Sequence, residues 1–248
     1  MILRRESYLP IETKNLDEID AFDKPLFKLH PRVLDAVIGK ILLPSHISVL
    51  HGEERFPLTA ISHAVMIGAG KNNKHAIYLD SGSNFNPQLI RVLSQGDEEH
   101  VLDRIKIANP LSLADLEMIM ESVESMENIS LVVIDSLTGI MNMSAAPGSK
   151  ERQRQLFKTL EVLRNIVLRL NTHLLLTDHS AKNWRTGQSR PVGGNVIDHA
   201  VDSVIQVTTL QEVPDAVRID VERTPITPNP GGVILKIGHK GIRSIKSP

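Results

Sequence analysis

The chain has 248 residues, 41% of them hydrophobic, and its 28 basic and 29 acidic side chains give a formal net charge of −1. Near-neutral charge excludes a generally basic surface, so nucleic-acid binding would need a local patch. The absence of cysteine excludes disulfides and zinc–thiolate sites, and no apolar run approaches the ~18 residues of a membrane span. We expect a soluble intracellular protein with one substantial core.

Residues 1–30 are predicted to form an N-terminal extension or arm, because they carry mixed charges, no clear period and several prolines. Apolar side chains such as Phe22, Leu26 and Phe27 would pack on the body of the same chain or on a neighbour. From Pro31 onward the pattern becomes regular, which predicts a single core domain over residues 31–248.

In this core, short apolar stretches typical of strands alternate with helical patterns. The strands are predicted at residues 47–50, 75–79, 105–108, 131–134 and 172–177, and the helices at 61–67, 89–93, 112–126 and 150–170. Such alternation indicates βαβ units and a mostly parallel sheet flanked by helices. After residue 202, short strands separated by turn residues predict antiparallel hairpins at the C-terminal edge. The fold class is therefore α/β.

The stretch from Gly52 to Thr59 has the strand, loop and helix layout of a nucleotide-binding P-loop. Laying the pattern G-x-x-x-x-G-K-[ST] on Gly52 places Pro57 at the second glycine, Leu58 at the lysine and Thr59 at the final hydroxyl. Only the two ends of the pattern are present.

The missing parts are those that hold a triphosphate. Pro57 has no N–H to donate, Leu58 brings no charge, and Glu53 and Glu54 are negative where the ligand would be negative. Each misplaced charge costs roughly 3 kcal/mol at ~5 Å and an effective dielectric of ~20, and Arg55 offsets part of this. The alternative interpretation is an unrelated connection between a strand and a helix.

Four landmarks follow one another along the chain: the loop at residues 52–59, a strand ending at Asp80, a strand ending at Asp135, and the segment PVGGNVIDHA at residues 191–200. In this order they resemble the core ATPase domain of the RecA and RadA recombinase superfamily, which includes archaeal RadA and RadB and the KaiC-like proteins. The resemblance covers roughly residues 31–243 and implies a RecA-like fold.

The resemblance also implies roles for single residues. It predicts a degenerate nucleotide site made of Gly52, Arg55, Thr59, Asp80, Asp135 and His199. In the family, Asp135 would organise Mg²⁺ and His199 would lie near the nucleotide of an adjoining subunit. Here we interpret Asp80, Asp135 and His199 as structural remnants, with Asp135 hydrogen-bonded to Thr59 or to nearby backbone.

Two further family positions differ. Where the family has Asp-Thr-Glu, with the Glu activating the attacking water, this chain has Asp80, Ser81 and Gly82. Where the family often has Asn-Gln, a pair that senses the γ-phosphate, this chain has Asp178 and His179. Phosphate positioning, water activation and sensing are therefore all altered, which predicts a pseudo-ATPase and no catalytic residue.

Two loops of the family bind single-stranded DNA. The matching stretches are residues 141–155 and residues 181–190. Basic side chains beside an aromatic that can stack on a base make a workable single-strand site. The candidate DNA-binding residues are Arg152, Arg154, Lys182, Trp184, Arg185 and Arg190.

The sequence therefore predicts a non-catalytic or weakly ATP-binding paralog that serves as an accessory factor in homologous recombination and DNA repair. Its expected partners are a RadA-type recombinase or another paralog, and single-stranded DNA, within a homo- or hetero-oligomer. No cofactor is expected beyond weakly bound ATP and Mg²⁺, and the expected location is cytoplasmic or nucleoid-associated, without membrane contact. Two alternatives stay open: an atypical active ATPase with Arg55 replacing the lysine and Glu53 or Glu54 as base, and a KaiC-like scaffold or signalling protein without a DNA role.

Overall fold

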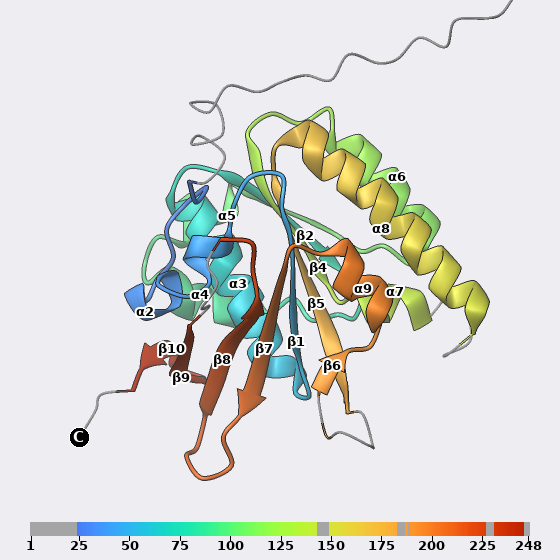
Figure 1. Cartoon of the computed structure of the whole chain (residues 1–248). Helices are drawn as coiled ribbons and strands as arrows, with labels where there is room; N and C mark the ends of the chain where they lie inside the picture. The colour runs from blue at the N-terminus through green and yellow to red at the C-terminus, as the bar shows by residue number, and fades with distance from the viewer. Residues whose placement is uncertain (1–23, 143–148, 183–186, 188, 227–230, 246–248) are drawn as a thin grey trace, which may run out of the picture.

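A computed structural model of the chain describes residues 24–142, 149–182, 187, 189–226 and 231–245. In these residues, ten strands form one sheet whose main path has the order β10-β9-β8-β7-β1-β5-β4-β2-β3, with β6 paired to β5 (Figure 1). The strands are β1 (Ile47–Gly52), β2 (His75–Asp80), β3 (Ile105–Ala108), β4 (Ile129–Asp135), β5 (His173–Lys182), β6 (Ser189–Pro191), β7 (Ser203–Thr209), β8 (Ala216–Arg223), β9 (Gly232–Gly238) and β10 (Gly241–Ser244).

The pairing directions divide this sheet into two parts. From β7 through β1, β5, β4 and β2 to β3, every pair is parallel. From β7 through β8 and β9 to β10, every pair is antiparallel. The predicted fold class, a mostly parallel RecA-like sheet with antiparallel strands at the C-terminal edge, is confirmed.

Helices cover both faces of the parallel part (Figure 1). The helices are α2 (Arg32–Asp35), the 3₁₀ helix η1 (Gly39–Ile41), α3 (Arg55–Lys71), α4 (Pro87–Ser94), α5 (Glu98–Leu102), α6 (Leu113–Val123), α7 (Leu137–Asn142), α8 (Lys150–Leu170) and α9 (Asn195–Ala200). Within the described ranges, no helix combines the length and apolarity that crossing a bilayer requires.

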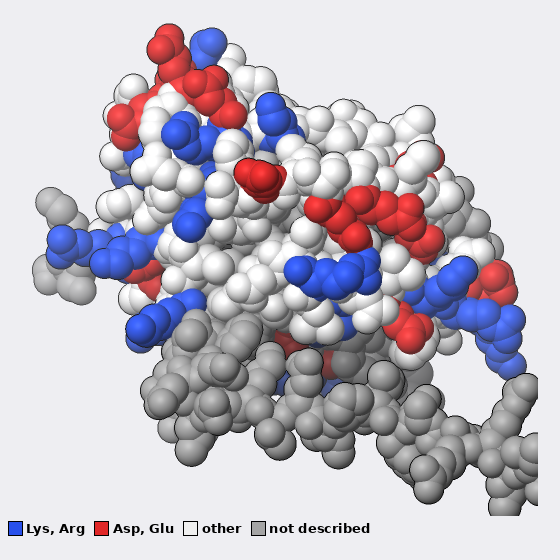
Figure 2. All heavy atoms as spheres, turned by 90° about the horizontal axis from the view of Figure 1, so that it is seen from above, with Lys and Arg blue, Asp and Glu red and all other residues white. Residues whose placement is uncertain are grey.

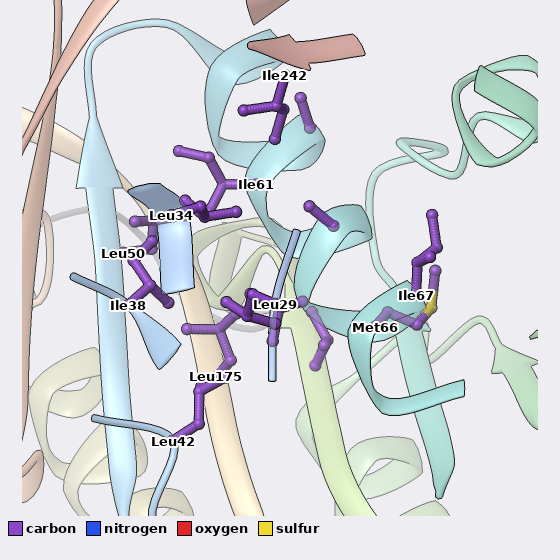
Figure 3. Packing of buried hydrophobic residues seen from close by; sticks show 14 of the residues in the cluster. Leu29, Leu34, Ile38, Leu42, Leu50, Ile61, Met66, Ile67, Leu175 and Ile242 are labelled. Carbon is purple, nitrogen blue, oxygen red and sulfur yellow. The ribbon is translucent and has the colours of Figure 1, made fainter. Parts of the chain in front are cut away.

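Each face of the sheet has its own hydrophobic core. Successive strand residues point to opposite faces, so on β1 Leu50 joins the cluster under α3 while Val49 joins the cluster under α6 and α8. Both side chains are fully buried. Figure 3 shows the first cluster, in which Ile61 of α3 lies near Leu50 of β1, and Met66 lies beside Ile67 of the same helix.

The segment immediately before Pro31 is part of this first core. Phe27 and Leu29 are buried in it, and the Leu26 N–H donates to the Leu42 carbonyl at 2.9 Å. The packed part of the chain therefore begins before residue 31, where the sequence analysis places the boundary between arm and core. Phe22 lies outside the described residues.

Candidate functional site

The predicted motif residues lie together at the carboxyl ends of the parallel strands. Asp80 at the end of β2 is the register partner of Asp135 at the end of β4. Gly52 at the end of β1 is the register partner of His179 on β5. Motifs separated by more than a hundred residues in the sequence are thus neighbours in space, as in other open α/β sheets.

The connection from β1 to α3 differs from the predicted loop. β1 ends at Gly52 and α3 begins at Arg55, so only Glu53 and Glu54 lie between them. The sequence analysis places the helix start near residue 61, which is wrong. Pro57 is compatible with this early start because a proline in the first helical turn removes an N–H that has no partner inside the helix.

Helical geometry at residues 55–59 changes what this stretch can bind. A phosphate-binding loop directs several backbone N–H groups at one anion, whereas here these residues form the first turn of α3. Leu58, at the lysine position, is buried in the core. Arg55 is exposed at the start of the helix.

Gly52 has a packing role. A Cβ at this position would lie 2.7 Å from the Val207 carbonyl oxygen and 3.3 Å from a methyl group of Leu58. Because both neighbours belong to well-packed elements, the close approach of β7 to β1 requires glycine here, with or without a nucleotide.

The Asp135 carboxylate is the centre of a buried hydrogen-bond cluster. It accepts from Thr59 Oγ1 at 2.8 Å, Tyr78 Oη at 2.5 Å, Thr177 Oγ1 at 2.7 Å and Asn84 Nδ2 at 3.1 Å. The predicted hydrogen bond between Thr59 and Asp135 is confirmed. Burial and the negative charge of Asp135 raise the pKa of Tyr78, so its phenol stays protonated and donates.

These contacts allow a physical test of whether the residues fit Mg²⁺ and a nucleotide triphosphate, which the fold implies. The Thr59 hydroxyl, whose oxygen would ligate Mg²⁺ in a P-loop, donates its proton to Asp135. The four donors occupy the carboxylate, the lysine position holds buried Leu58, and the loop is helical. The residues at this site therefore do not fit Mg²⁺ and a nucleotide triphosphate.

Asp80 supports the loop that follows β2. Its carboxylate, 5% exposed, accepts the backbone N–H groups of Gly82, Asn84 and Phe85 at 3.1, 2.8 and 3.0 Å. Ser81 then joins this loop to the end of β4, because its hydroxyl donates to the Ser136 carbonyl at 2.6 Å. A carboxylate that accepts three backbone N–H groups holds a loop in place, which agrees with the structural interpretation of Asp80.

His63 belongs to the same buried region and was not predicted from the sequence. It is fully buried on α3, accepts the Asn86 N–H at Nε2 over 3.1 Å, and packs edge-on against Tyr78 with ring centroids 5.0 Å apart. Burial lowers the pKa of His63 to about 4, so the ring is neutral at physiological pH. Its position one helical turn after Thr59 is the sequence signal that would have placed it here.

The first DNA-binding candidates lie on a helix. Arg152 and Arg154 both belong to the first turns of α8. Arg154 is well exposed, with its Nη1 3.9 Å from a carboxylate oxygen of Glu151. Arg152 is only 7% exposed, because α8 packs that face inward. The structure therefore does not place this side chain on the surface, and its contact with DNA stays a prediction.

The Arg152 charge instead acts on Asp178, at the altered sensor position. Asp178 is 1% exposed, and burial raises its pKa to about 7, while backbone hydrogen bonds and Arg152 oppose this rise. One oxygen of Asp178 and one nitrogen of Arg152 have no hydrogen-bond partner.

The second set of DNA-binding candidates is only partly described. Arg190 is exposed on β6, with its Nη1 3.9 Å from Asp198. Lys182 is the last residue of β5, and its side chain lies outside the described residues, as do Trp184 and Arg185. His199 is exposed on α9.

Charges of both signs share the face seen in Figure 2, where Lys and Arg side chains are interspersed with Asp and Glu side chains. The visible part of this face therefore offers no continuous basic surface. This agrees with the net charge of −1.

The fold and the arrangement of the motifs at the sheet edge define a RecA-like α/β core domain. A family model described as Rad51 matches residues 29–244. The chain belongs to this family.

Individual relatives cover most of the chain. It is 25% identical over 184 residues to the DNA repair and recombination protein RadB of Methanococcus maripaludis, covering 73% of this chain and 84% of that protein. It is 26% identical over 219 residues to RadB of Pyrococcus horikoshii, covering 86% and 92%. The crystal structure of the RadB recombinase superposes with a TM-score of 0.71 at 20% identity, covering 86% of this chain and 96% of that one, which supports the fold.

Proposed function

We propose that this protein acts in recombinational DNA repair as an accessory member of the Rad51 family, by binding partners and without efficient ATP turnover. The link to repair rests on relatives that are named as DNA repair and recombination proteins. The accessory role rests on the geometry of the degenerate nucleotide site.

The observation that carries the proposal is the occupation of Asp135 by four internal donors. An entering Mg²⁺ would have to displace hydrogen bonds to a charged group, each worth about 1.5–3 kcal/mol. The β1–α3 connection offers no lysine to compensate for this loss. Binding of Mg-ATP is therefore weak in this proposal, and hydrolysis lacks both phosphate positioning and a base.

The edge strand β3 supports a binding role. It ends the sheet, and within the described residues it is paired only with β2. Ile107 on this strand is 44% exposed and Leu111, just after it, is 70% exposed. An unpaired strand edge beside apolar side chains can receive an added strand from a second protein chain. A second copy, a recombinase or another paralog is the proposed partner.

Single-stranded DNA is the second proposed partner. Arg154 and Arg190 are exposed in the structure, and the sequence places Lys182, Trp184 and Arg185 in the segment that leads to Arg190. Phosphate contacts from these side chains would make binding depend on salt.

Thermal unfolding with and without Mg-ATP tests the nucleotide proposal. At about 1 mM ATP, a site with a Kd near 10 μM would add about 2.7 kcal/mol of stability and raise the Tm by several degrees. We expect a shift below ~2 °C and no steady phosphate release. A large shift that Arg55→Ala abolishes would instead establish the atypical ATPase.

Fluorescence anisotropy with single-stranded DNA tests the second partner. We expect salt-sensitive binding that Trp184→Ala combined with Arg185→Ala weakens about tenfold or more, since a stacked base contributes ~1–3 kcal/mol. Arg218→Ala, which removes an exposed arginine of β8, is the matched control and should bind as the unaltered protein does. Equal affinity for the double variant and the control would contradict the assignment.

A further inference from the structure

A polar groove of about 820 Å³ is lined by residues of β5, β6, β7, β8 and α9. Ser180, Ser189, Arg190, Gln206 and Glu222 are among the lining residues.

The buried side chain of His51 contacts two of these lining residues, Ser180 and Glu222. Its Nδ1 is 2.9 Å from Ser180 Oγ, and its Nε2 is 3.2 Å from Glu222 Oε2. The His51 side chain is fully buried, whereas the Glu222 side chain is 39% exposed. Three separate strands, β1, β5 and β8, thus place a hydroxyl, an imidazole and a carboxylate in one continuous chain of hydrogen bonds.

The donor and acceptor groups of these three side chains determine where the protons of the two hydrogen bonds lie. An ionised carboxylate has only acceptors, so the contact between Nε2 and Glu222 requires the ring to carry its proton on Nε2. In the neutral tautomer with its proton on Nε2, the ring has no proton on Nδ1, which can then only accept a hydrogen bond. In this tautomer Ser180 donates its hydroxyl proton to His51, as the nucleophile does in a serine hydrolase.

We propose that Ser180, His51 and Glu222 form a second reactive site, in which Ser180 is an activated nucleophile toward carboxylic esters. This goes beyond the proposed function in recombinational repair and does not depend on it. Nucleophile, base and orienting carboxylate stand in the order that acyl transfer needs, and such sets occur on unrelated folds.

The reaction balances with water as the only co-reactant. Ser180 Oγ attacks the ester carbonyl while its proton passes to His51 Nδ1. The C–O bond to the alcohol breaks, and the leaving oxygen takes that proton. Water then attacks the acyl-serine, again giving a proton to His51, and the carboxylic acid leaves as Ser180 recovers its hydrogen. Glu222 stabilises the imidazolium in both steps.

The groove supplies polar donors for the charge that develops on the carbonyl oxygen. The Gln206 amide and the Arg190 guanidinium both line it. Hydrogen-bond donors of this kind can stabilise an oxyanion. The charged residues that line the groove are four acidic ones, Glu53, Glu54, Asp198 and Glu222, and two basic ones, Arg190 and Arg223. This excess of acidic side chains disfavours anionic substrates, so the proposed substrate class is neutral esters.

A fluorescent fluorophosphonate probe tests the nucleophile directly on the full-length chain. Such a probe forms an Oγ–P bond and releases fluoride only at an activated serine. We expect labelling that peptide mapping assigns to Ser180 and that Ser180→Ala abolishes. Ser244→Ala, which removes an exposed serine of β10 outside the groove, should be labelled at the unaltered rate.

Glu222 is tested as a positioning residue. Glu222→Gln should slow labelling by about tenfold or more and alter its pH profile, and Glu222→Asp should restore part of the rate. Hydrolysis of a 4-nitrophenyl ester should fall in parallel. The proposal is overturned if the native protein is not labelled, if the label maps to another residue, or if Ser180→Ala is labelled as fast as the unaltered chain.

Discussion

Two hydrogen-bond clusters at the carboxyl side of the sheet differ in what surrounds them. Around Asp135, the carboxylate and three of its four donors, Thr59, Tyr78 and Thr177, are buried, and the fourth donor, Asn84, is half-buried. Around His51, only the central ring is fully buried, and its partners Ser180 and Glu222 line an open groove. The first cluster is mostly buried, and we call it the sealed cluster. The second can be reached from solvent, and we call it the open cluster.

The cluster that matches the family's nucleotide site is therefore not the cluster that solvent can reach. The sealed cluster is built on positions that match the family's nucleotide site, whereas the open cluster uses residues to which the resemblance gives no role. A buried polar cluster with its groups satisfied contributes rigidity and specificity to a fold. A cluster with one exposed end has side chains available for chemistry, so the clusters should respond differently to substitution.

The largest effect is expected from Asp135→Ala, which removes the acceptor shared by the sealed cluster. Buried Thr59, Tyr78 and Thr177 would each lose a hydrogen bond to a charged group, so we expect the free energy of unfolding to fall by about 3–5 kcal/mol. Urea denaturation measures this loss. Asp97→Ala, which removes an exposed carboxylate next to Lys71, should change stability by less than about 0.5 kcal/mol. Similar values for the two variants would contradict the contrast.

A smaller effect is expected from acid, acting through His63. Because its pKa is lowered to about 4 in the folded chain and is ~6.5 when unfolded, the unfolded state binds more protons between these values. Stability is therefore fully present above about pH 6.5 and falls as the pH drops toward 4.

We expect His63→Gln, which keeps an acceptor for the Asn86 N–H, to lessen this fall by about 2–3 kcal/mol. Unfolding free energies measured from pH 7 to 4 test it. Buried His173, with its pKa also lowered to about 4, should retain its own contribution in the variant. A slope identical to that of the unaltered chain would show that the ring is protonated without cost.

The smallest effect is expected from Glu222→Gln in the open cluster. Since this side chain is 39% exposed and glutamine can still accept from His51, stability should change by less than about 1 kcal/mol. The same preparation serves the labelling experiment and shows that slower labelling does not come from unfolding. A loss as large as that of Asp135→Ala would make the second cluster structural as well.

The sequence predicts elements whose signals are local. The helix at residues 150–170 has the predicted bounds because its leucine spacing is regular, Ser149 caps its start and Asn171 ends it in the left-handed conformation. The bond between Thr59 and Asp135 was also predictable, since the family motif places both residues at one sheet edge.

Other features depend on information that a linear pattern lacks. The degenerate motif predicts a loop at Pro57, although a proline in the first turn is compatible with a helix. The charge of Arg152 predicts a surface position, but tertiary packing buries the side chain. The His51 cluster joins residues 129 and 171 positions apart in the sequence, so only the assembled strands reveal it.

The early start of α3 limits any return to nucleotide binding. The spacing from Gly52 to Thr59 is that of a complete motif, so reinstating glycine at position 57 and lysine at position 58 would look sufficient in an alignment. Yet the new lysine would replace a core leucine, and its helical turn would have to unwind before any amide could face a phosphate. Single substitutions along that route would each weaken folding before they improved catalysis, which makes the loss hard to reverse by ordinary mutation and selection.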